Sequence, residues 1–170
     1  MSKYLLGMLW VLAVLAGACT TEATGNEAAV RYPSDTLGGK ITRTEAQWKA
    51  QLSSKAYYVL REKGTEWPYT SKWLKNKTKG TYVCAGCGHP VFASETKFES
   101  GTGWPSFFAP LRKNSVETHE DRGFAMTRTE VVCAKCGGHL GHVFDDGPKP
   151  TGLRYCLNGV ALDFKPAEKK

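Results

Sequence analysis

Two Cys-x-x-Cys pairs are the strongest chemical signal in the chain. Cys84 and Cys87 form the first pair, Cys133 and Cys136 form the second, and each pair follows a valine and precedes a glycine. A hairpin of this spacing presents both thiolates to one point, so two hairpins can enclose one tetrahedral Zn²⁺ ion. The glycine allows a tight backbone turn at the second ligand. The sequence therefore predicts one structural zinc ion per chain, held by an internally duplicated knuckle.

Two other chemistries use the same spacing, namely a disulfide within each pair and a thioredoxin-like redox pair. A disulfide that closes so short a loop stabilises the fold by about 2 kcal/mol. A structural zinc ion contributes ~10–16 kcal/mol to the folding of a small peptide. A redox pair of this type opens a helix inside a βαβ unit, and no helical pattern follows either pair here. Both comparisons favour zinc.

Cys156 has no partner in this scheme. It lies in the segment RYCLN at residues 154–158, and the alternation of a strand would place Arg154, Cys156 and Asn158 on one face. A guanidinium, a thiol and an amide on one face are typical of a site rather than of a core. The nearby cation is expected to lower the pKa of the thiol from ~8.5. The competing interpretation is a buried, inert thiol, the commonest fate of a single cysteine.

Two histidines, His139 and His142, stand three residues apart in a glycine-rich segment. As metal ligands they would be redundant, because four cysteines already complete a tetrahedron. As acids they suit a reaction in which a thiolate attacks and an oxygen must be protonated, since imidazole titrates near neutral pH. The histidines therefore favour a catalytic interpretation of Cys156.

The composition indicates one globular domain that positions these groups. The chain has 170 residues, of which 41% are hydrophobic and 23% charged, and a net charge of +7. These values exclude a collagen-like, coiled-coil or wholly disordered protein. We expect two short helices first, with Thr42 capping the first of them, and from Gly80 onward short strands separated by Gly and Pro. The last strand is expected to run from Leu153 to Phe164 with a bulge at Gly159.

The first residues have the layout of an export signal. Lys3 precedes an uncharged apolar run that is too short to span a bilayer comfortably and that ends in small residues before Cys19. This end resembles a bacterial lipobox, in which Cys19 is lipidated, and it also fits a plain A-x-A cleavage site. We expect an export signal at 1–18 and a flexible tether at 19–40. The mature chain, with a charge of +6 after loss of one lysine, is expected in the bacterial periplasm, anchored to the membrane as a lipoprotein.

Three blocks of sequence resemble the methionine sulfoxide reductase B family, the peptide-methionine (R)-S-oxide reductases. They are residues 100–107 (SGTGWPSF), 138–148 (GHLGHVFDDGP) and 154–158 (RYCLN), and both Cys-x-x-Cys pairs lie where the zinc-containing members of the family have them. The resemblance covers residues 41–165 and leaves 166–170 as a tail. It implies a mainly β fold, in which two antiparallel sheets surround the active site and short helices lie at the N-terminal end.

The resemblance also implies a role for each matching residue. Cys156 is the nucleophile that attacks the sulfoxide sulfur, and Arg154 assists its thiolate. His139 and His142 position and protonate the sulfoxide oxygen, and Asn158 orients it. The implied function is reduction of the R epimer of methionine sulfoxide in oxidised proteins, which repairs oxidative damage.

Two further positions follow from the resemblance. Trp104 matches the indole that packs against the methyl group of the substrate. Thr102 stands where many members have a resolving cysteine, so the sulfenic acid left on Cys156 needs an external reductant. We expect a thioredoxin-like donor or a small thiol, and no intramolecular disulfide.

Two other classes of function remain as alternatives. A non-catalytic zinc-ribbon module could use the basic charge to bind nucleic acid, but no run of five or six like charges supports this, and an export signal argues against a nucleic-acid partner. A thiol–disulfide oxidoreductase could be built on Cys156, but such an enzyme would not need two histidines to protonate an oxygen.

Overall fold

The structure is a computed structural model and describes residues 39–168 except 124–125. The chain divides into two units, residues 1–31 and 32–170, and the described residues belong to the second. The predicted export signal, Cys19 and most of the predicted tether lie outside the described residues. Among the helices of the described part, none is long and apolar enough to cross a bilayer.

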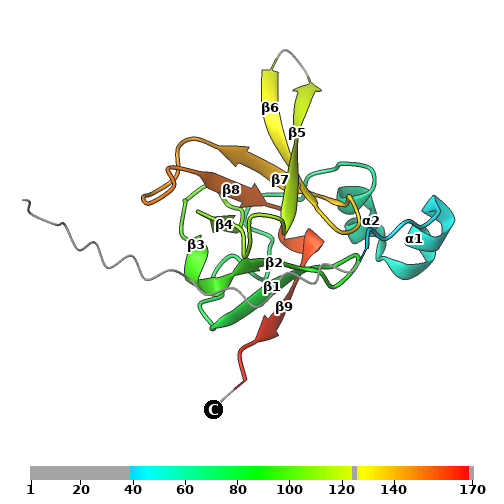
Figure 1. Ribbon diagram of the computed structural model, residues 1–170, viewed down its shortest axis with the longest axis horizontal. Coiled ribbons are helices and arrows are strands. Elements are labelled where there is room, and N and C mark those ends of the chain that lie inside the picture. The colour runs from blue at the N-terminus through cyan, green and yellow to red at the C-terminus, as the bar shows by residue number, and fades with distance from the viewer. Residues whose placement is uncertain (1–38, 124–125, 169–170) are drawn as a thin grey trace, which may run out of the picture. The chain divides into compact units, whose positions relative to one another are not determined.

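Two short helices come first, α1 (Glu45–Gln51) and α2 (Ser54–Leu60) (Figure 1). The N-cap of α1 is Thr44, so the prediction of Thr42 is wrong. The Thr44 hydroxyl accepts from the Gln47 N–H, and the Gln47 side chain accepts from the Thr44 N–H. This capping box starts the helix at Glu45, two residues later than a Thr42 cap would start it.

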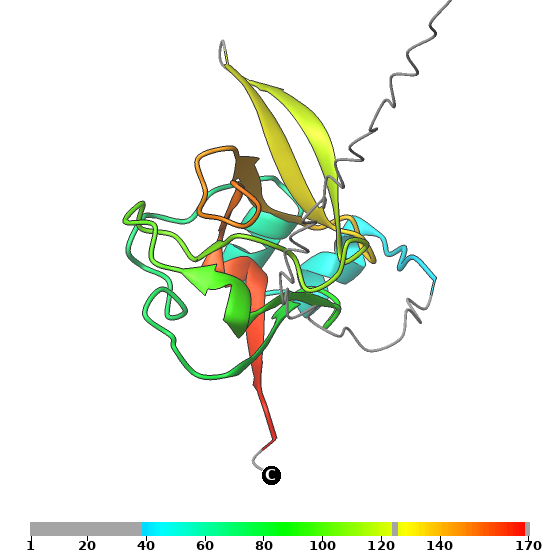
Figure 2. The ribbon, with the colours of Figure 1, turned by 60° about the vertical axis from the view of Figure 1, so that its left-hand side comes forward.

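The strands form two antiparallel sheets, as expected (Figures 1 and 2). The three-stranded sheet has the order β2–β1–β9, with β1 at Gly80–Cys84, β2 at Pro90–Ala93 and β9 at Leu162–Pro166. The six-stranded sheet has the order β3–β4–β8–β7–β6–β5. Its strands are β3 (Lys97–Phe98), β4 (Ser106–Phe107), β5 (Val116–Gly123), β6 (Met126–Cys133), β7 (His139–Phe144) and β8 (Arg154–Leu157).

The predicted strand from Leu153 to Phe164 is instead two strands in different sheets. β8 ends at Leu157, a 3₁₀ turn follows at Gly159–Ala161, and β9 then joins the other sheet. The turn forms because the Glu66 carboxylate accepts from the backbone N–H groups of Gly159 and Val160. A tertiary contact thus turns the chain where local alternation predicts that it continues.

The core lies between the two sheets. Tyr82 and Phe92 come from the three-stranded sheet, Phe107 and Leu157 from the six-stranded one, and all four are fully buried. The ring centroids of Phe92 and Phe107 are 4.7 Å apart and the ring planes are tilted by 32°, a separation within the range that aromatic pairs favour. On β8 the residues alternate, since Tyr155 and Leu157 are buried and Arg154 and Cys156 are only partly so. Cys156 therefore lies on the sheet face that points away from this core.

Candidate functional site

One transverse row of side chains crosses the six-stranded sheet at Cys156. Ser106 on β4, Cys156 on β8, His142 on β7 and Glu130 on β6 are opposite one another in successive strands. Residues that are directly opposite in antiparallel strands project to the same face. The backbones approach closely beside this row, because a Cβ on Gly141 would collide with the carbonyl oxygen of Cys156. Strand pairing thus brings together groups that are 12 to 50 positions apart in the chain.

Cys156 is half-buried, and its surroundings contradict one expectation. Burial raises the pKa of the Cys156 thiol, and contacts with Thr102 and Arg154 lower it by less. The prediction of a lowered pKa is therefore wrong. One reason is Asp146, which the sequence argument missed: Arg154 donates Nε and Nη2 to its carboxylate at 2.8 and 2.9 Å. The guanidinium also lies over the Phe144 ring, 4.5 Å from its centroid, so its charge is shared and its position is constrained.

His139 is held by a buried carboxylate that the sequence argument also missed. Its Nδ1 lies 2.7 Å from Oε1 of Glu130, and the other oxygen of Glu130 accepts from Lys63 at 2.8 Å. Burial raises the pKa of Glu130, but Lys63 and His139 outweigh it and hold that pKa below its ordinary value. An ionised carboxylate only accepts, so Nδ1 of His139 carries a proton. The sequence feature that could have indicated this role is the position of Glu130, a single acidic residue directly before the apolar end of β6.

The other nitrogen of His139 is poised for proton transfer. Burial lowers the pKa of His139 and outweighs the opposite effect of Glu130, so the ring is neutral near pH 7. Its Nε2 then has a lone pair, and this atom is buried without a hydrogen-bond partner among the described residues. The ring can therefore take up a proton at Nε2, and Glu130 stabilises the resulting imidazolium.

His142 is held in the same manner. Its Nε2 lies 2.8 Å from Oδ2 of Asp121, and the hydrogen bond with His142 helps to hold the pKa of Asp121 below its ordinary value. Arg128 binds the same carboxylate oxygen at 2.7 Å. The ring centroids of His139 and His142 are 5.3 Å apart. The structure thus brings both predicted histidines together, each beside an acidic partner.

Trp104 and Asn158 meet at one residue, Glu66. The indole Nε1 of Trp104 donates to the Glu66 carbonyl at 3.1 Å, and Oδ1 of Asn158 accepts from the Glu66 N–H at 3.0 Å. Asn158 is buried, and its Nδ2 also donates to the Leu140 carbonyl at 3.2 Å. Glu66 thus connects the indole to the segment that follows Cys156. The sequence argument gave no role to Glu66, which carries no motif signal.

The four paired cysteines form a cluster suited to a metal ion. One sulfur from each lies within 4.8 Å of the others. The Sγ atoms of Cys84 and Cys136 are 3.7 Å apart, and those of Cys87 and Cys133 are 3.6 Å apart. A tetrahedron with Zn–S bonds of ~2.3 Å has edges of ~3.8 Å, so the spacing fits. All four are free thiols, which excludes the alternative of a disulfide within each pair.

The cluster joins parts of the fold that are distant in sequence. Cys84 ends a strand of the three-stranded sheet and Cys133 ends a strand of the six-stranded sheet. The glycine after each pair, Gly88 and Gly137, has φ of 71° and 67°, the left-handed conformation that the tight turn requires. The N-terminal helices bind to both turns, through Gln51 to the Gly86 carbonyl and Arg61 to the Cys136 carbonyl. A bound ion would therefore link both sheets and the helices.

These features define a mainly β thiol enzyme that has carboxylate-held imidazoles beside a cysteine and a separate four-cysteine metal cluster. The SelR domain model matches residues 52–166. The chain is 54% identical over 129 residues to the peptide methionine sulfoxide reductase MsrB of Methanosarcina mazei, covering 76% of this chain and 92% of that protein. Proteins of the same description from Leptospira interrogans and Agrobacterium fabrum are 52% identical over 126 residues and 50% identical over 133. These two matches cover 74% and 78% of this chain, and 96% and 98% of the relatives.

The chain therefore belongs to the MsrB family of peptide methionine sulfoxide reductases. Membership of this family argues against the non-catalytic zinc-ribbon module that the basic charge suggested.

Proposed function

We propose that this protein reduces the R epimer of methionine sulfoxide in oxidised proteins, with Cys156 as the nucleophile. The observation that carries the proposal is the position of Cys156, which lies directly opposite His142 on the neighbouring strand. His139, with its free Nε2, lies beside His142. A thiol and two imidazoles on one face can transfer an oxygen atom together with its proton.

The first half of the reaction transfers the oxygen from the substrate to Cys156, and it needs no reagent other than the protein and the sulfoxide. The sulfur of Cys156 attacks the sulfoxide sulfur and forms a sulfur–sulfur bond. That bond and the sulfur–oxygen bond of the substrate then break as the oxygen moves to Cys156, which releases the thioether. The oxygen ends on Cys156 as a sulfenic acid, and the thiol proton reaches it through the imidazoles. Trp104 packs against the methyl group, Arg154 stabilises the thiolate, and Asn158 orients the oxygen. In the second half, two external thiols supply two electrons and release water and a disulfide.

The stereochemistry is tested with blocked methionine sulfoxide supplied as separated R and S epimers, with dithiothreitol as reductant. We expect reduction of the R epimer alone, because a site with a fixed indole wall and fixed proton donors accepts one arrangement at sulfur. Reduction is measured by chromatography of the thioether product. Equal rates for both epimers, or no reduction by folded protein, would contradict the proposal.

The role of Glu130 gives a prediction on pH dependence. Glu130→Gln keeps the shape of the side chain but removes the charge that raises the pKa of His139. We expect kcat to fall by about 10- to 100-fold, within the range for general acid–base groups. The acid limb of the pH profile should move to lower pH, because the pKa of the ring that must take up the thiol proton falls further without the carboxylate.

Glu117→Gln is the matched control, since it makes the same chemical change on neighbouring β5 at a carboxylate paired with Lys40. Its profile should match that of the wild type. An unshifted acid limb in Glu130→Gln would show that Glu130 does not act on a catalytic imidazole.

The proposal includes the reductant, the metal and the cellular location. Residue 102 is a threonine and not a cysteine. This supports direct reduction of the sulfenic acid by a thioredoxin-like donor. The thiolate donor set and its spacing support zinc as the metal. The first 18 residues support export to the periplasm and a lipid anchor on Cys19, ahead of a tether to residue 40 and a catalytic domain at 41–165. A Cys156–Cys19 disulfide after one turnover, detected by mass spectrometry, would contradict direct reduction.

A further inference from the structure

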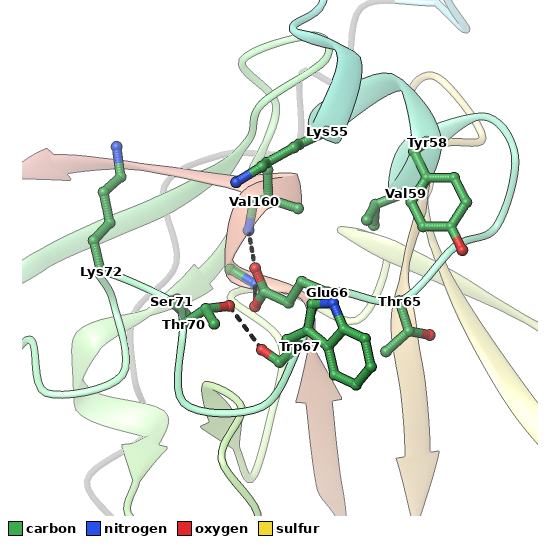
Figure 3. Close-up of a pocket in the computed structure, with 11 residues that line it drawn as sticks. Lys55, Tyr58, Val59, Thr65, Glu66, Trp67, Thr70, Ser71, Lys72 and Val160 are labelled. Carbon is green, nitrogen blue, oxygen red and sulfur yellow. Dashed lines mark hydrogen bonds between the residues drawn. The ribbon is translucent and has the colours of Figure 1, made fainter.

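A cavity of about 470 Å³ is lined in part by Glu66, the residue that also contacts Trp104 and Asn158. Its apolar walls come from α2, from the loop that follows it and from the turn after β8 (Figure 3). The side chains that form these walls are Tyr58, Val59, Trp67 and Val160. Such a volume suits one or two amino-acid side chains rather than a whole folded partner.

Glu66 lies between this cavity and residues of the catalytic site. Its carboxylate accepts from the N–H groups of Gly159 and Val160, which also line the cavity (Figure 3). Its carbonyl accepts from the Trp104 indole, and its N–H donates to Asn158. A single residue therefore separates the cavity from the indole that packs against the substrate methyl group. A polypeptide bound at the site would have its neighbouring residues within reach of the cavity, since an extended chain advances ~3.3 Å per residue.

Trp67 provides the second observation. Its side chain is 80% exposed although it lines the cavity. An indole left in water does not contribute to the core, and exposed aromatic side chains beside a cavity are typical binding anchors. Tyr58, on the opposite wall, is also exposed.

The charge of the cavity selects the kind of peptide. Lys55 and Lys72 both line it, and neither amine forms an ion pair with a carboxylate in the described part of the chain. The one carboxylate in the lining, Glu66, is occupied by two backbone N–H groups. The lining therefore combines apolar walls with unneutralised positive charge.

We propose that this cavity binds the substrate polypeptide next to the oxidised methionine, at a bulky apolar side chain accompanied by an acidic residue. The proposal rests on the reductase function stated above. It makes the protein selective for certain methionine sites, because residues outside the reacting side chain then contribute to binding.

The experiment compares two kinds of substrate. One is a set of peptides that contain methionine sulfoxide, and the other is the blocked amino acid methionine sulfoxide, which is too small to reach the cavity. In the peptides, a Phe-Asp pair is moved through each position within about four residues of the sulfoxide. At the preferred position, kcat/KM should exceed that of a Phe-Lys peptide by about tenfold, mainly through KM. Trp67→Ala should reduce the ratio of kcat/KM for peptide over blocked amino acid by about tenfold.

Lys55→Glu should remove the preference for Asp over Lys, and Lys113→Glu, the same charge change at an exposed residue outside the cavity, should not. Peptide preferences that survive both Trp67→Ala and Lys55→Glu would overturn the proposal. Loss of activity on the blocked amino acid itself would instead count against the reductase function, so the two failures are distinguishable.

A chain of hydroxyl groups supports a second, independent inference at Thr102. Oγ1 of Thr102 lies 3.8 Å from Sγ of Cys156 and 2.9 Å from Oγ of Ser100. Oγ of Ser100 lies 2.7 Å from Oγ of Ser106, which donates to the Trp104 carbonyl at 3.2 Å. Each hydroxyl has one proton, so the chain can run in only one direction at a time.

The direction depends on the charge of Cys156. With a neutral thiol, the S–H donates to Thr102, and each hydroxyl donates onward to the Trp104 carbonyl. With a thiolate, Ser106 donates to Ser100, Ser100 donates to Thr102, and Thr102 donates to the sulfur. We propose that this reversal stabilises the thiolate. Thr102 is then a positioning residue, which donates a hydrogen bond to the sulfur of Cys156 instead of forming a disulfide with it as a resolving cysteine would. Hydrogen bonds to ionised groups are about twice as strong as neutral ones.

The test measures the rate at which iodoacetamide alkylates Cys156 as a function of pH in the metal-loaded protein. Thr102→Val keeps the shape and removes the hydroxyl, and the apparent pKa should rise by about one unit, which slows alkylation near pH 7 about tenfold. Thr102→Ser restores the hydroxyl and should restore the wild-type profile. An unchanged profile in Thr102→Val, or an equal shift in Thr102→Ser, would overturn the inference.

Discussion

Replacing Cys156 by serine is expected to abolish methionine sulfoxide reduction, with a loss of at least ~10³-fold in kcat. A serine hydroxyl is a far weaker nucleophile toward sulfur than a thiol, and it cannot form the sulfenic acid through which the oxygen leaves. The side chain is half-buried and faces away from the core, so the substitution should leave the fold unchanged. The initial rate on the R epimer is the measurement.

Cys19→Ser is the matched control, since it makes the same substitution at a cysteine outside both the row at Cys156 and the metal cluster. With dithiothreitol as reductant it should have the wild-type rate. Thermal unfolding of both variants separates a chemical effect from a folding effect. Substantial activity in folded Cys156→Ser would remove Cys156 from the mechanism and leave the transverse row without a nucleophile.

Loss of the metal is expected to have the largest effect on stability. The cluster connects a strand end in each sheet, and its two turns accept hydrogen bonds from Gln51 and Arg61 of the N-terminal helical segment. Hydrogen bonds with Cys133 and Cys136 raise the pKa of Cys84 well above its ordinary value, while hydrogen bonds with Cys133 and Cys84 lower that of Cys136, so without a cation the four thiols do not all ionise together. A cation offsets this cost, so binding free energy becomes folding free energy. Cys133→Ser should lower Tm by more than about 10 °C.

Metal content per chain, measured by mass spectrometry, should be one zinc ion in the wild type and much less in Cys133→Ser. Cys156→Ser should retain the full content, which distinguishes the structural cysteines from the catalytic one. A chelator strong enough to remove the ion should lower Tm and activity in parallel. A chelated protein that kept the wild-type Tm would show that the four thiols are not a structural metal site.

Local sequence was sufficient where the chemistry depends on near neighbours. The Cys-x-x-Cys-Gly spacing predicted each knuckle, because both ligands and the glycine turn lie within five residues. The alternation around Cys156 correctly placed Arg154 and Cys156 on a face outside the core, because the side chains of a strand point to opposite faces.

Two of the predictions that failed depended on groups outside the local segment. The strand predicted through Gly159 turns instead because Glu66, more than 90 positions earlier, binds its N–H. The lowered pKa of Cys156 was inferred from Arg154 alone. Burial and the Asp146 carboxylate, which shares that charge, reverse the net effect.

The sequence by itself determined the metal ligands, the nucleophile candidate, the paired histidines and the mainly β class, because motif spacing and side-chain alternation are local properties. Only the tertiary structure revealed Glu130 behind His139, Asp121 behind His142, and Glu66 between the cavity and the indole. These groups meet through strand register and loop packing. Register is decided by which strands pair across the whole sheet, and protonation is decided by burial and neighbouring charges, neither of which a linear motif specifies.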